Sequence, residues 1–285
     1  MDEARRLFDR IIETQLQEGK LLSVPFNIMM YKYAHMGDMF SFNALITQML
    51  DLGMKLDEDT YVHIIRAYIR WNDPETAFEY YRKMLSQGIS QTLHSYHIVI
   101  DLFAKMNNEN GMMEVIRTMI TKGIMPNEHT LALLVGYYVN LGKVEEARKV
   151  QDLFKKSFPH ISGYMRCHNI IINHYAKLEN RAGVLKEVHR ATAVFGAILD
   201  INSYTCMVKL FALSDIKAAR KIFELALEKC RHGLDGEIFA TMIEASYNAG
   251  DYDSAIEIYN RMNALDIVPD QKIIKLCSRL KATGR

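Results

Sequence analysis

The chain has 285 residues, of which 49% are hydrophobic and 24% are charged, and this balance is typical of a folded soluble protein. No apolar run approaches the roughly 18 residues that a membrane-spanning helix needs. The formal net charge of +1 argues against a uniformly basic nucleic-acid binder, although basic groups can still be gathered on one face.

The first 22 residues predict one amphipathic helix, over residues 4–15, with Phe8 and Ile11 on its apolar stripe. It resembles the second half of a helical hairpin whose first helix is missing. The opening residues carry acidic groups and do not resemble a secretory or organellar leader.

From residue 23 the chain repeats itself with a period of about 35, a spacing set by Gly53, Gly88 and Gly123. Small changes in length affect the fifth and sixth units, and the fifth is one residue longer than the others. The register predicts seven full units: 23–57, 58–92, 93–127, 128–162, 165–200, 201–235 and 236–270. Residues 271–285 then predict a lone capping helix, so that 1–285 forms a single array.

The first half of each unit carries apolar or aromatic residues at its fourth, seventh, eighth and eleventh positions. These spacings place them on one stripe of a helix, and such a stripe is usually core. The fourth positions hold Phe26, Tyr61, Tyr96, Leu131, His168, Tyr204 and Phe239. The eleventh positions hold Tyr33, Tyr68, Phe103, Tyr138, Tyr175, Phe211 and Ser246.

A turn follows each first helix, and its residues are mostly glycine or asparagine, which tolerate the left-handed backbone that ends a helix. This column reads Gly37, Asn72, Asn107, Gly142 and Gly250. In the second unit, Asp73 and Pro74 are suited to cap and to begin the next helix. Each unit is therefore predicted to be a helical hairpin, which buries its faces only by stacking on its neighbours.

This pattern resembles the pentatricopeptide repeat, in a P-type-like tandem array. Phe26-Asn27 near a unit start, Ala249-Gly250 in a turn and Pro269-Asp270 at a unit end carry the resemblance. The tetratricopeptide repeat, a protein-binding alternative, has period 34 and a Trp/Leu-Gly/Tyr pattern, whereas Trp71 is the only tryptophan here. The resemblance implies an all-α fold, a right-handed α-solenoid of stacked helix-turn-helix repeats.

The resemblance also implies binding of single-stranded RNA, with about one base read per repeat. In that family the fifth and last residues of a repeat hydrogen-bond the base edge. Asn27 with Asp57 matches a uracil-type pair, and so does Asn169 with Asp200. Thr205 with Asp235 matches a guanine-type pair. Four pairs depart from the usual combinations: Val62 with Thr92, His97 with Asn127, Ala132 with Ser162, and Ala240 with Asp270. Of these, His97 and Asn127 are kept as candidate base-reading residues.

Two further columns follow from the resemblance. The second residue of each repeat packs against the base, and the candidates are Val24, His94, His129 and Arg166. A basic residue late in the first helix contacts the phosphate, and the candidates are His35, Arg70, Lys105 and Lys177. Asp59 and Glu237, also at second positions, should repel a phosphate backbone. An ordinary solvated helix face would show lysine and arginine too, so that reading stays open.

No cofactor and no metal are expected. The four cysteines, Cys167, Cys206, Cys230 and Cys277, lack the spacing of a zinc site and are read as reduced thiols. The chain contains no H-E-x-x-H motif, phosphate-binding glycine loop or G-x-S-x-G motif, so catalysis is not expected.

The expected function is an RNA-binding adaptor in organellar RNA processing, stability or translation, with a mitochondrial or chloroplast location implied by the resemblance. The alternative is a protein-interaction scaffold, or a subunit of a larger ribonucleoprotein assembly such as a mitochondrial ribosome.

Overall fold

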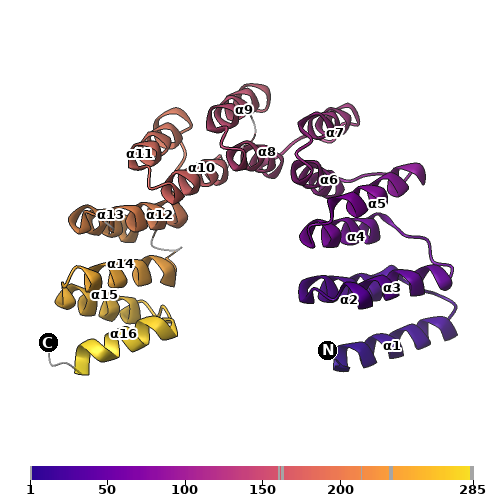
Figure 1. Ribbon diagram of the computed structural model, residues 1–285, viewed down its shortest axis with the longest axis horizontal. Coiled ribbons are helices and arrows are strands. Elements are labelled where there is room, and N and C mark those ends of the chain that lie inside the picture. Colours follow the sequence, from indigo (N-terminus) through magenta and orange to yellow (C-terminus); the bar gives the residue numbers. More distant parts are fainter. Residues whose placement is uncertain (1, 160, 162–163, 213, 231–233, 283–285) are drawn as a thin grey trace. The chain divides into compact units, whose positions relative to one another are not determined.

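The computed structural model describes residues 2–159, 161, 164–212, 214–230 and 234–282. Every regular element in those ranges is a helix (Figure 1), so the predicted all-α fold class is confirmed. The chain divides into two compact units, residues 1–133 and 134–285. The division falls inside helix α8 (Glu128–Asn140), and a single array over all 285 residues stays a prediction.

The first unit is a stack of helical hairpins. Its helices are α1 (Asp2–Gln17), α2 (Ser23–Met36), α3 (Met39–Asp51), α4 (Glu58–Arg70), α5 (Pro74–Ser86), α6 (Leu93–Lys105), α7 (Glu109–Thr121) and the start of α8. The first helices α2, α4 and α6 pack side by side, and each is covered by the second helix of its own hairpin.

The second unit repeats this arrangement, with α10, α12 and α14 as neighbouring first helices. Its helices after α8 are α9 (Val144–Ser157), α10 (Met165–Lys177), α11 (Arg181–His189), η1 (Arg190–Val194), α12 (Ile201–Ala212), α13 (Ile216–Lys229), α14 (Gly236–Asn248), α15 (Tyr252–Ala264) and α16 (Gln271–Ala282).

The core of both units includes the first-helix residues that the repeat register places on one stripe, together with second-helix residues such as Phe42, Met84 and Phe223. All seven residues at the fourth position are buried, including His168. The eleventh column is less uniform than predicted, because Tyr175 and Phe211 are only half-buried. In α1 the prediction for Ile11 is wrong: Ile11 is exposed, and the next residue, Ile12, is buried with Phe8.

The turns within the hairpins adopt the left-handed conformation that the glycine and asparagine column indicates. Asn72 has a φ of 60° and Asn107 a φ of 52°. In the fifth repeat the same conformation is taken by Glu179, with a φ of 52°, which no sequence signal marks. Asp73 caps α5 as predicted, because its carboxylate accepts a hydrogen bond from the Thr76 amide at 3.1 Å. Such a cap contributes about 1 kcal/mol to stability.

The additional residue of the fifth repeat is accommodated in its second helix. After His189 the helix α11 continues as the π-helical segment η1, which has a wider turn and holds one extra residue. The Phe195 amide donates to the Arg190 carbonyl at 3.2 Å, five residues back, as a π-turn requires. The insertion is therefore absorbed without displacing the next first helix from the stack.

Gly183 lies where the second helix α11 approaches the first helix α10 closely. A methyl group on Gly183 would lie 2.5 Å from a ring carbon of Tyr175. Gly183→Ala is therefore expected to lower the free energy of unfolding by about 1–3 kcal/mol, although alanine is the better helix former. Gly136→Ala is the control, because no atom lies within 4 Å of its added methyl group. It should raise stability by about 0.5–1 kcal/mol. Urea unfolding of both variants checks the prediction, and equal shifts would contradict it.

Candidate nucleic-acid interface

The candidate base-reading residues lie where two neighbouring first helices meet. In several repeats the last residue is the N-cap of the next first helix, as Asp57 is for α4, Thr92 for α6 and Asp235 for α14. The fifth residue of a repeat lies at the start of the second turn of the first helix of the same repeat, as Asn27 does in α2. Because these helices pack side by side, the fifth and last residues of one repeat can face each other across the junction between two hairpins.

In the first repeat, the structure brings Asn27 and Asp57 together through Thr60. The Thr60 hydroxyl lies 3.1 Å from Asn27 Oδ1 and 2.7 Å from Asp57 Oδ1. The Thr60 amide donates to the same carboxylate oxygen at 2.8 Å, and the Ser23 hydroxyl donates to Oδ2 at 2.6 Å. Asn27 is buried, whereas Asp57 is exposed at the mouth of the junction.

Asp57 is held as a carboxylate that keeps room for one more donor. Partial burial opposes its ionisation, but the hydrogen bonds from Ser23 and Thr60 outweigh that effect and lower the pKa of Asp57. A carboxylate has about four acceptor positions, and the three hydrogen bonds above leave one of them.

The fifth repeat repeats this geometry in the second unit. Asn169 Nδ2 donates to Asp200 Oδ2 at 2.7 Å. The Ser203 hydroxyl lies 2.6 Å from Asn169 Oδ1 and 2.9 Å from Asp200 Oδ1. The Asn169 side chain is therefore held at both its oxygen and its nitrogen.

The third repeat builds a different site from His97 and Asn127. His97 Nε2 lies 2.9 Å from the Thr130 hydroxyl, and Thr130 is in turn 3.3 Å from Asn127 Oδ1. The His97 and His129 rings meet edge to face, with their centroids 4.6 Å apart. A non-standard pair is thus joined in the same way as the two uracil-type pairs.

Where both members of a remaining pair are described, no hydrogen bond of the structure joins them. The Thr205 hydroxyl donates within its own helix to the Ile201 carbonyl at 2.9 Å, while Asp235 caps α14. In the second repeat the fifth residue is the buried, apolar Val62, and in the seventh it is Ala240. For the fourth repeat, Ala132 is buried and Ser162 lies outside the described residues.

Sequence reasoning missed the residue that joins the pairs. Thr60, Thr130 and Ser203 each occupy the third position of the following repeat, and all three are fully buried. The available signal was the column of hydroxyl residues at that position. When each repeat is considered by itself this hydroxyl is not linked to the reading pair, because it belongs to the next repeat.

The candidate packing and phosphate-contacting residues are accessible. Val24, His94 and Arg166 are exposed and His129 is half-buried, and His35, Arg70, Lys105 and Lys177 are all exposed. Two contacts link neighbouring first helices in the first unit. Arg70 Nη1 lies 3.1 Å from His35 Nδ1, and Arg66 Nη2 lies 2.9 Å from His94 Nε2. Leu213, at the phosphate position of the sixth repeat, lies outside the described residues.

Acidic groups lie on the first helices outside this basic column. Burial raises the pKa of Asp101, against the opposing effect of Lys105, so its negative charge is disfavoured. In the second unit Glu237 forms an ion pair with Lys209, which neutralises a cation on the same face. At the phosphate positions themselves the first unit carries His35, Arg70 and Lys105, whereas the described residues of the second unit carry one basic group there, Lys177.

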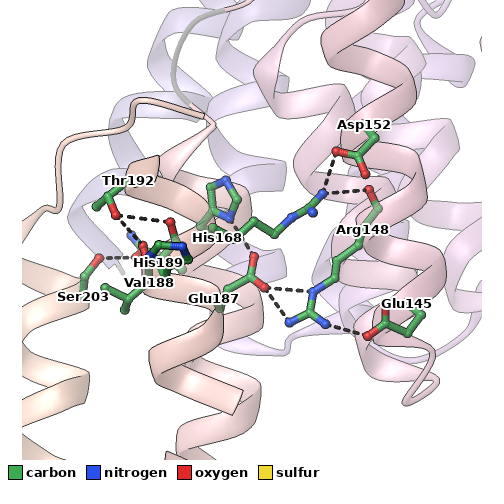
Figure 2. Close-up of polar contacts among 11 residues, drawn as sticks. Glu145, Arg148, Asp152, His168, Glu187, Val188, His189, Thr192 and Ser203 are labelled. Carbon is green, nitrogen blue, oxygen red and sulfur yellow. Dashed lines mark hydrogen bonds and ion pairs between the residues drawn. The ribbon is translucent and has the colours of Figure 1, made fainter. Parts of the chain in front are cut away.

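The second unit also contains a buried charged cluster away from this face (Figure 2). Glu187 lies between Arg148 and His168, with its Oε2 2.8 Å from Arg148 Nη2 and its Oε1 2.7 Å from His168 Nδ1. Glu187 and His168 are fully buried, so the cluster is a structural link among α9, α10 and α11. Burial opposes the ionisation of Glu187, but the bonds from His168 and Arg148 lower its pKa.

Three of the cysteines, Cys167, Cys206 and Cys230, are free thiols, and the side chain of Cys277 lies outside the described residues. Across the described ranges, no group of three or more His, Cys, Asp or Glu side chains is arranged to hold a metal ion. Among the same residues, no helix has the length and apolar character to cross a membrane.

Comparison with known proteins agrees with the resemblance. The family model described as the pentacotripeptide-repeat region of PRORP matches residues 13–163, more than half of the chain. The model of the single PPR repeat matches residues 237–267. None of the curated proteins compared by sequence matches the chain.

Among solved structures, the chain is similar to the pentatricopeptide repeat protein PPR10 from maize, with a TM-score of 0.53 and 16% identity. That match covers 98% of this chain and 44% of the maize chain, so this chain spans less than half of that protein. A weaker match, to the nuclear proteinaceous RNase P 2 (PRORP2) from A. thaliana, has a TM-score of 0.48 and 14% identity. It covers 66% of this chain and 42% of that chain.

Proposed function

The chain belongs to the pentatricopeptide repeat family, and on that premise we propose that it is a single-stranded RNA-binding adaptor that reads about one base per repeat. Its role is binding rather than catalysis. The observation that carries the proposal is the construction of the junctions at Asn27 with Asp57 and at Asn169 with Asp200. There, polar side chains are held at the boundary between first helices by partners in the next repeat.

The donor and acceptor pattern of the first junction fits the edge of uracil. With its oxygen bonded to Thr60, Asn27 presents its amide N–H groups as donors, and Asp57 has one acceptor position left. Uracil shows a carbonyl acceptor beside an N3–H donor, which complements this pair. Cytosine shows an N–H donor beside a bare N3 acceptor, so its N3 lone pair would face the carboxylate.

The exposed cations on the first helices supply the sequence-independent part of binding. Arg70 and Lys105 occupy the same position in successive repeats, so a strand that follows the stack would meet them in turn. Neutralising phosphates releases counterions, so the binding constant should fall as salt rises. Affinity should be concentrated in the first five repeats, because the basic column ends at Lys177.

A direct test is binding of the full chain to a short, uracil-rich single strand at several salt concentrations, measured by fluorescence anisotropy. We expect binding at low salt and a linear fall of log K with log salt concentration. Absence of binding at low salt by the folded chain would refute the proposal.

The phosphate contact predicts a specific mutant effect. Arg70→Gln should reduce the magnitude of the salt slope by about 0.7, the value for one phosphate contact on a single strand. It should weaken binding to all sequences about equally. Arg82→Gln is the matched control, because Arg82 is an exposed arginine on the second helix α5. If Arg82→Gln reduces the salt slope and Arg70→Gln does not, the RNA lies on the second helices and the assignment of Arg70 as a phosphate contact is wrong.

We place the chain in a mitochondrion or chloroplast, acting in RNA processing, stability or translation. Crosslinking in cells, with sequencing of the recovered RNA, tests both, because the RNAs recovered should be organellar.

The alternative function is a protein-interaction scaffold, such as a subunit of a ribonucleoprotein assembly. The pairing of Lys209 with Glu237 favours it for the last repeats, where that salt bridge removes a cation from the face. Recovery of a stable protein complex that persists after ribonuclease treatment, together with no binding to RNA, would favour the scaffold.

A further inference from the structure

All five histidines of the first unit lie on its first helices. They are His35 on α2, His63 on α4, His94 and His97 on α6, and His129 on α8. The helices α1, α3, α5 and α7 contain no histidine. Histidine is the side chain that ordinarily changes its charge between about pH 5 and pH 8. The helices to which we assign the RNA are therefore the part of this unit whose charge depends most on pH.

One of these histidines is bonded to an arginine of the neighbouring first helix. Arg66, the ninth residue of the second repeat, has its Nη2 2.9 Å from Nε2 of His94, the second residue of the third repeat. A guanidinium group can only donate hydrogen bonds, so this ring nitrogen must accept with its lone pair, and His94 is neutral in this arrangement. Arg66 is half-buried and His94 is exposed, so the pair is open to a ligand.

Protonation of His94 changes what this pair can bind. A proton on Nε2 removes the lone pair, so the bond from Arg66 is lost and two cations are left side by side. An anion that accepts from both groups would relieve their repulsion. A phosphodiester fits this requirement, because it is negative throughout the range in which histidine titrates and because arginine and imidazolium both donate strong hydrogen bonds to phosphate oxygens.

The groups around the pair favour an anion more strongly as the pH falls. The charged and titratable neighbours are Glu58, Asp59 and His63 on α4, Asp101 and Lys105 on α6, and His129 on α8. The Glu58 carboxylate, which accepts from the Thr92 amide at 2.7 Å, favours a proton on His94, whereas the charge of Arg66 opposes it. Burial raises the pKa of Asp101, so its protonation in acid removes a negative charge beside Arg66.

Building on the proposed function, we infer that Arg66 and His94 form a further phosphate site of the RNA, complete only when His94 carries a proton, so that the first unit takes up protons as it binds RNA. A nucleotide with its base at the second and fifth positions and its phosphate at the thirteenth position would cross the ninth position, where Arg66 lies. The complex then holds more protons than the free chain, and the binding constant therefore rises as the pH falls.

The sixth repeat shows the same two positions in contact without this dependence on pH. There the ninth residue, Lys209, forms an ion pair with Glu237, the second residue of the seventh repeat. A glutamate carboxylate ordinarily stays negative through the range in which histidine titrates, so it holds the cation at every pH in that range. The junction of Arg66 differs because its second-position residue is a histidine, which releases the arginine to an anion once it is protonated.

The test measures binding of the full chain to oligouridine at about pH 8 and about pH 6, at one ionic strength, by fluorescence anisotropy. Neither uracil nor the phosphodiester changes its charge between these values, so a change in affinity belongs to the protein. The wild type should bind more tightly at the lower pH. His94→Gln can still accept from Arg66 but cannot take up a proton, so its gain should be about two- to sixfold smaller, within the roughly tenfold per pH unit that one whole proton would give.

Two further variants separate the charge of His94 from its shape. His94→Lys carries a permanent cation, so it should bind more tightly than the wild type at the higher pH and lose the same part of the gain. His189→Gln is the matched control, because His189 is an exposed histidine on the second helix α11, and it should keep the wild-type gain.

Thermal unfolding at both pH values shows whether each variant is folded. A wild type that binds oligouridine equally at the two pH values overturns the inference. So does a folded His94→Gln with the full wild-type gain, or a His189→Gln that loses as much of the gain as His94→Gln does. If the folded wild type binds no RNA at either pH, the proposed function fails instead.

Discussion

Replacing Glu187 by alanine is expected to lower the free energy of unfolding of the second unit by about 3–5 kcal/mol. Arg148 and His168 both bond to this carboxylate in the interior, where Glu187 and His168 have no exposed surface. Removing the carboxylate leaves Arg148, whose side chain is only 6% exposed, without its buried counterion. The penalty for an uncompensated buried charge exceeds the modest net value of the ion pair itself.

The matched control is Glu145→Ala, because Glu145 pairs with the same guanidinium at 2.6 Å but is 67% exposed. A solvent-exposed partner contributes about 0–1 kcal/mol, so this variant should unfold nearly as the wild type does. Urea unfolding measures both, and hydrogen exchange should show the loss of protection in α9, α10 and α11 first. Equal effects of the two substitutions would show that burial of the cluster does not determine its strength.

The cluster also predicts sensitivity to acid. The pKa of Glu187 is lowered in the folded chain from its ordinary value of 4.5, so the folded state favours the carboxylate. The contribution of Glu187 to the free energy of unfolding is therefore complete at pH values above 4.5, and it is lost as the pH falls through the lower pKa of the folded state. Glu187→Gln should be less stable than the wild type at neutral pH, and the difference should shrink in acid. A difference in stability between Glu187→Gln and the wild type that stays constant from neutral to acid pH would show that ionisation of Glu187 does not stabilise the fold.

Much of the fold followed from the repeat register because the packing is local. A first helix meets its own second helix and the next hairpin, so a column of residues such as Phe26, Tyr61 and Tyr96 reports directly on burial. The errors arose where that regularity ends. At α1 the stripe was placed on Ile11 rather than Ile12, because a single helix outside the register gives little guidance on its rotation.

The site was less predictable, for a related reason. The reading positions were found by resemblance, but whether a pair is joined depends on a residue of the next repeat. Thr60 joins Asn27 to Asp57, whereas the apolar Ile238 has no group that could join Thr205 to Asp235. The buried cluster had no sequence signal at all, since Arg148 and Glu187 are 39 residues apart and come from helices of different repeats. His168 looked like an irregular member of an apolar column until its partner was known.

The largest expected change in RNA recognition comes from Asp57→Asn. The carboxylate can only accept, whereas an asparagine in its place can also donate, and a donor complements the bare N3 of cytosine rather than the N3–H of uracil. Asparagine is an equally good N-cap, so the bond from the Thr60 amide at 2.8 Å and the start of α4 should be kept. At one position of the strand the ratio of uracil to cytosine affinity should therefore shift toward cytosine by about 10- to 100-fold, the range for exchanging one specific base contact.

Asp38→Asn provides the control for this variant. Asp38 caps α3 through the Ser41 amide at 3.0 Å, which is the same local role at the start of a second helix rather than at a junction between first helices. It should leave the affinity for every strand unchanged. If the base preference of Asp57→Asn matches that of the wild type at every position while the fold is retained, Asp57 is a helix cap and no more, and the reading assignment for the first repeat is wrong. If the preference moves at one position alone, that position fixes the register of the RNA along the stack, because only the base facing the first junction can sense residue 57.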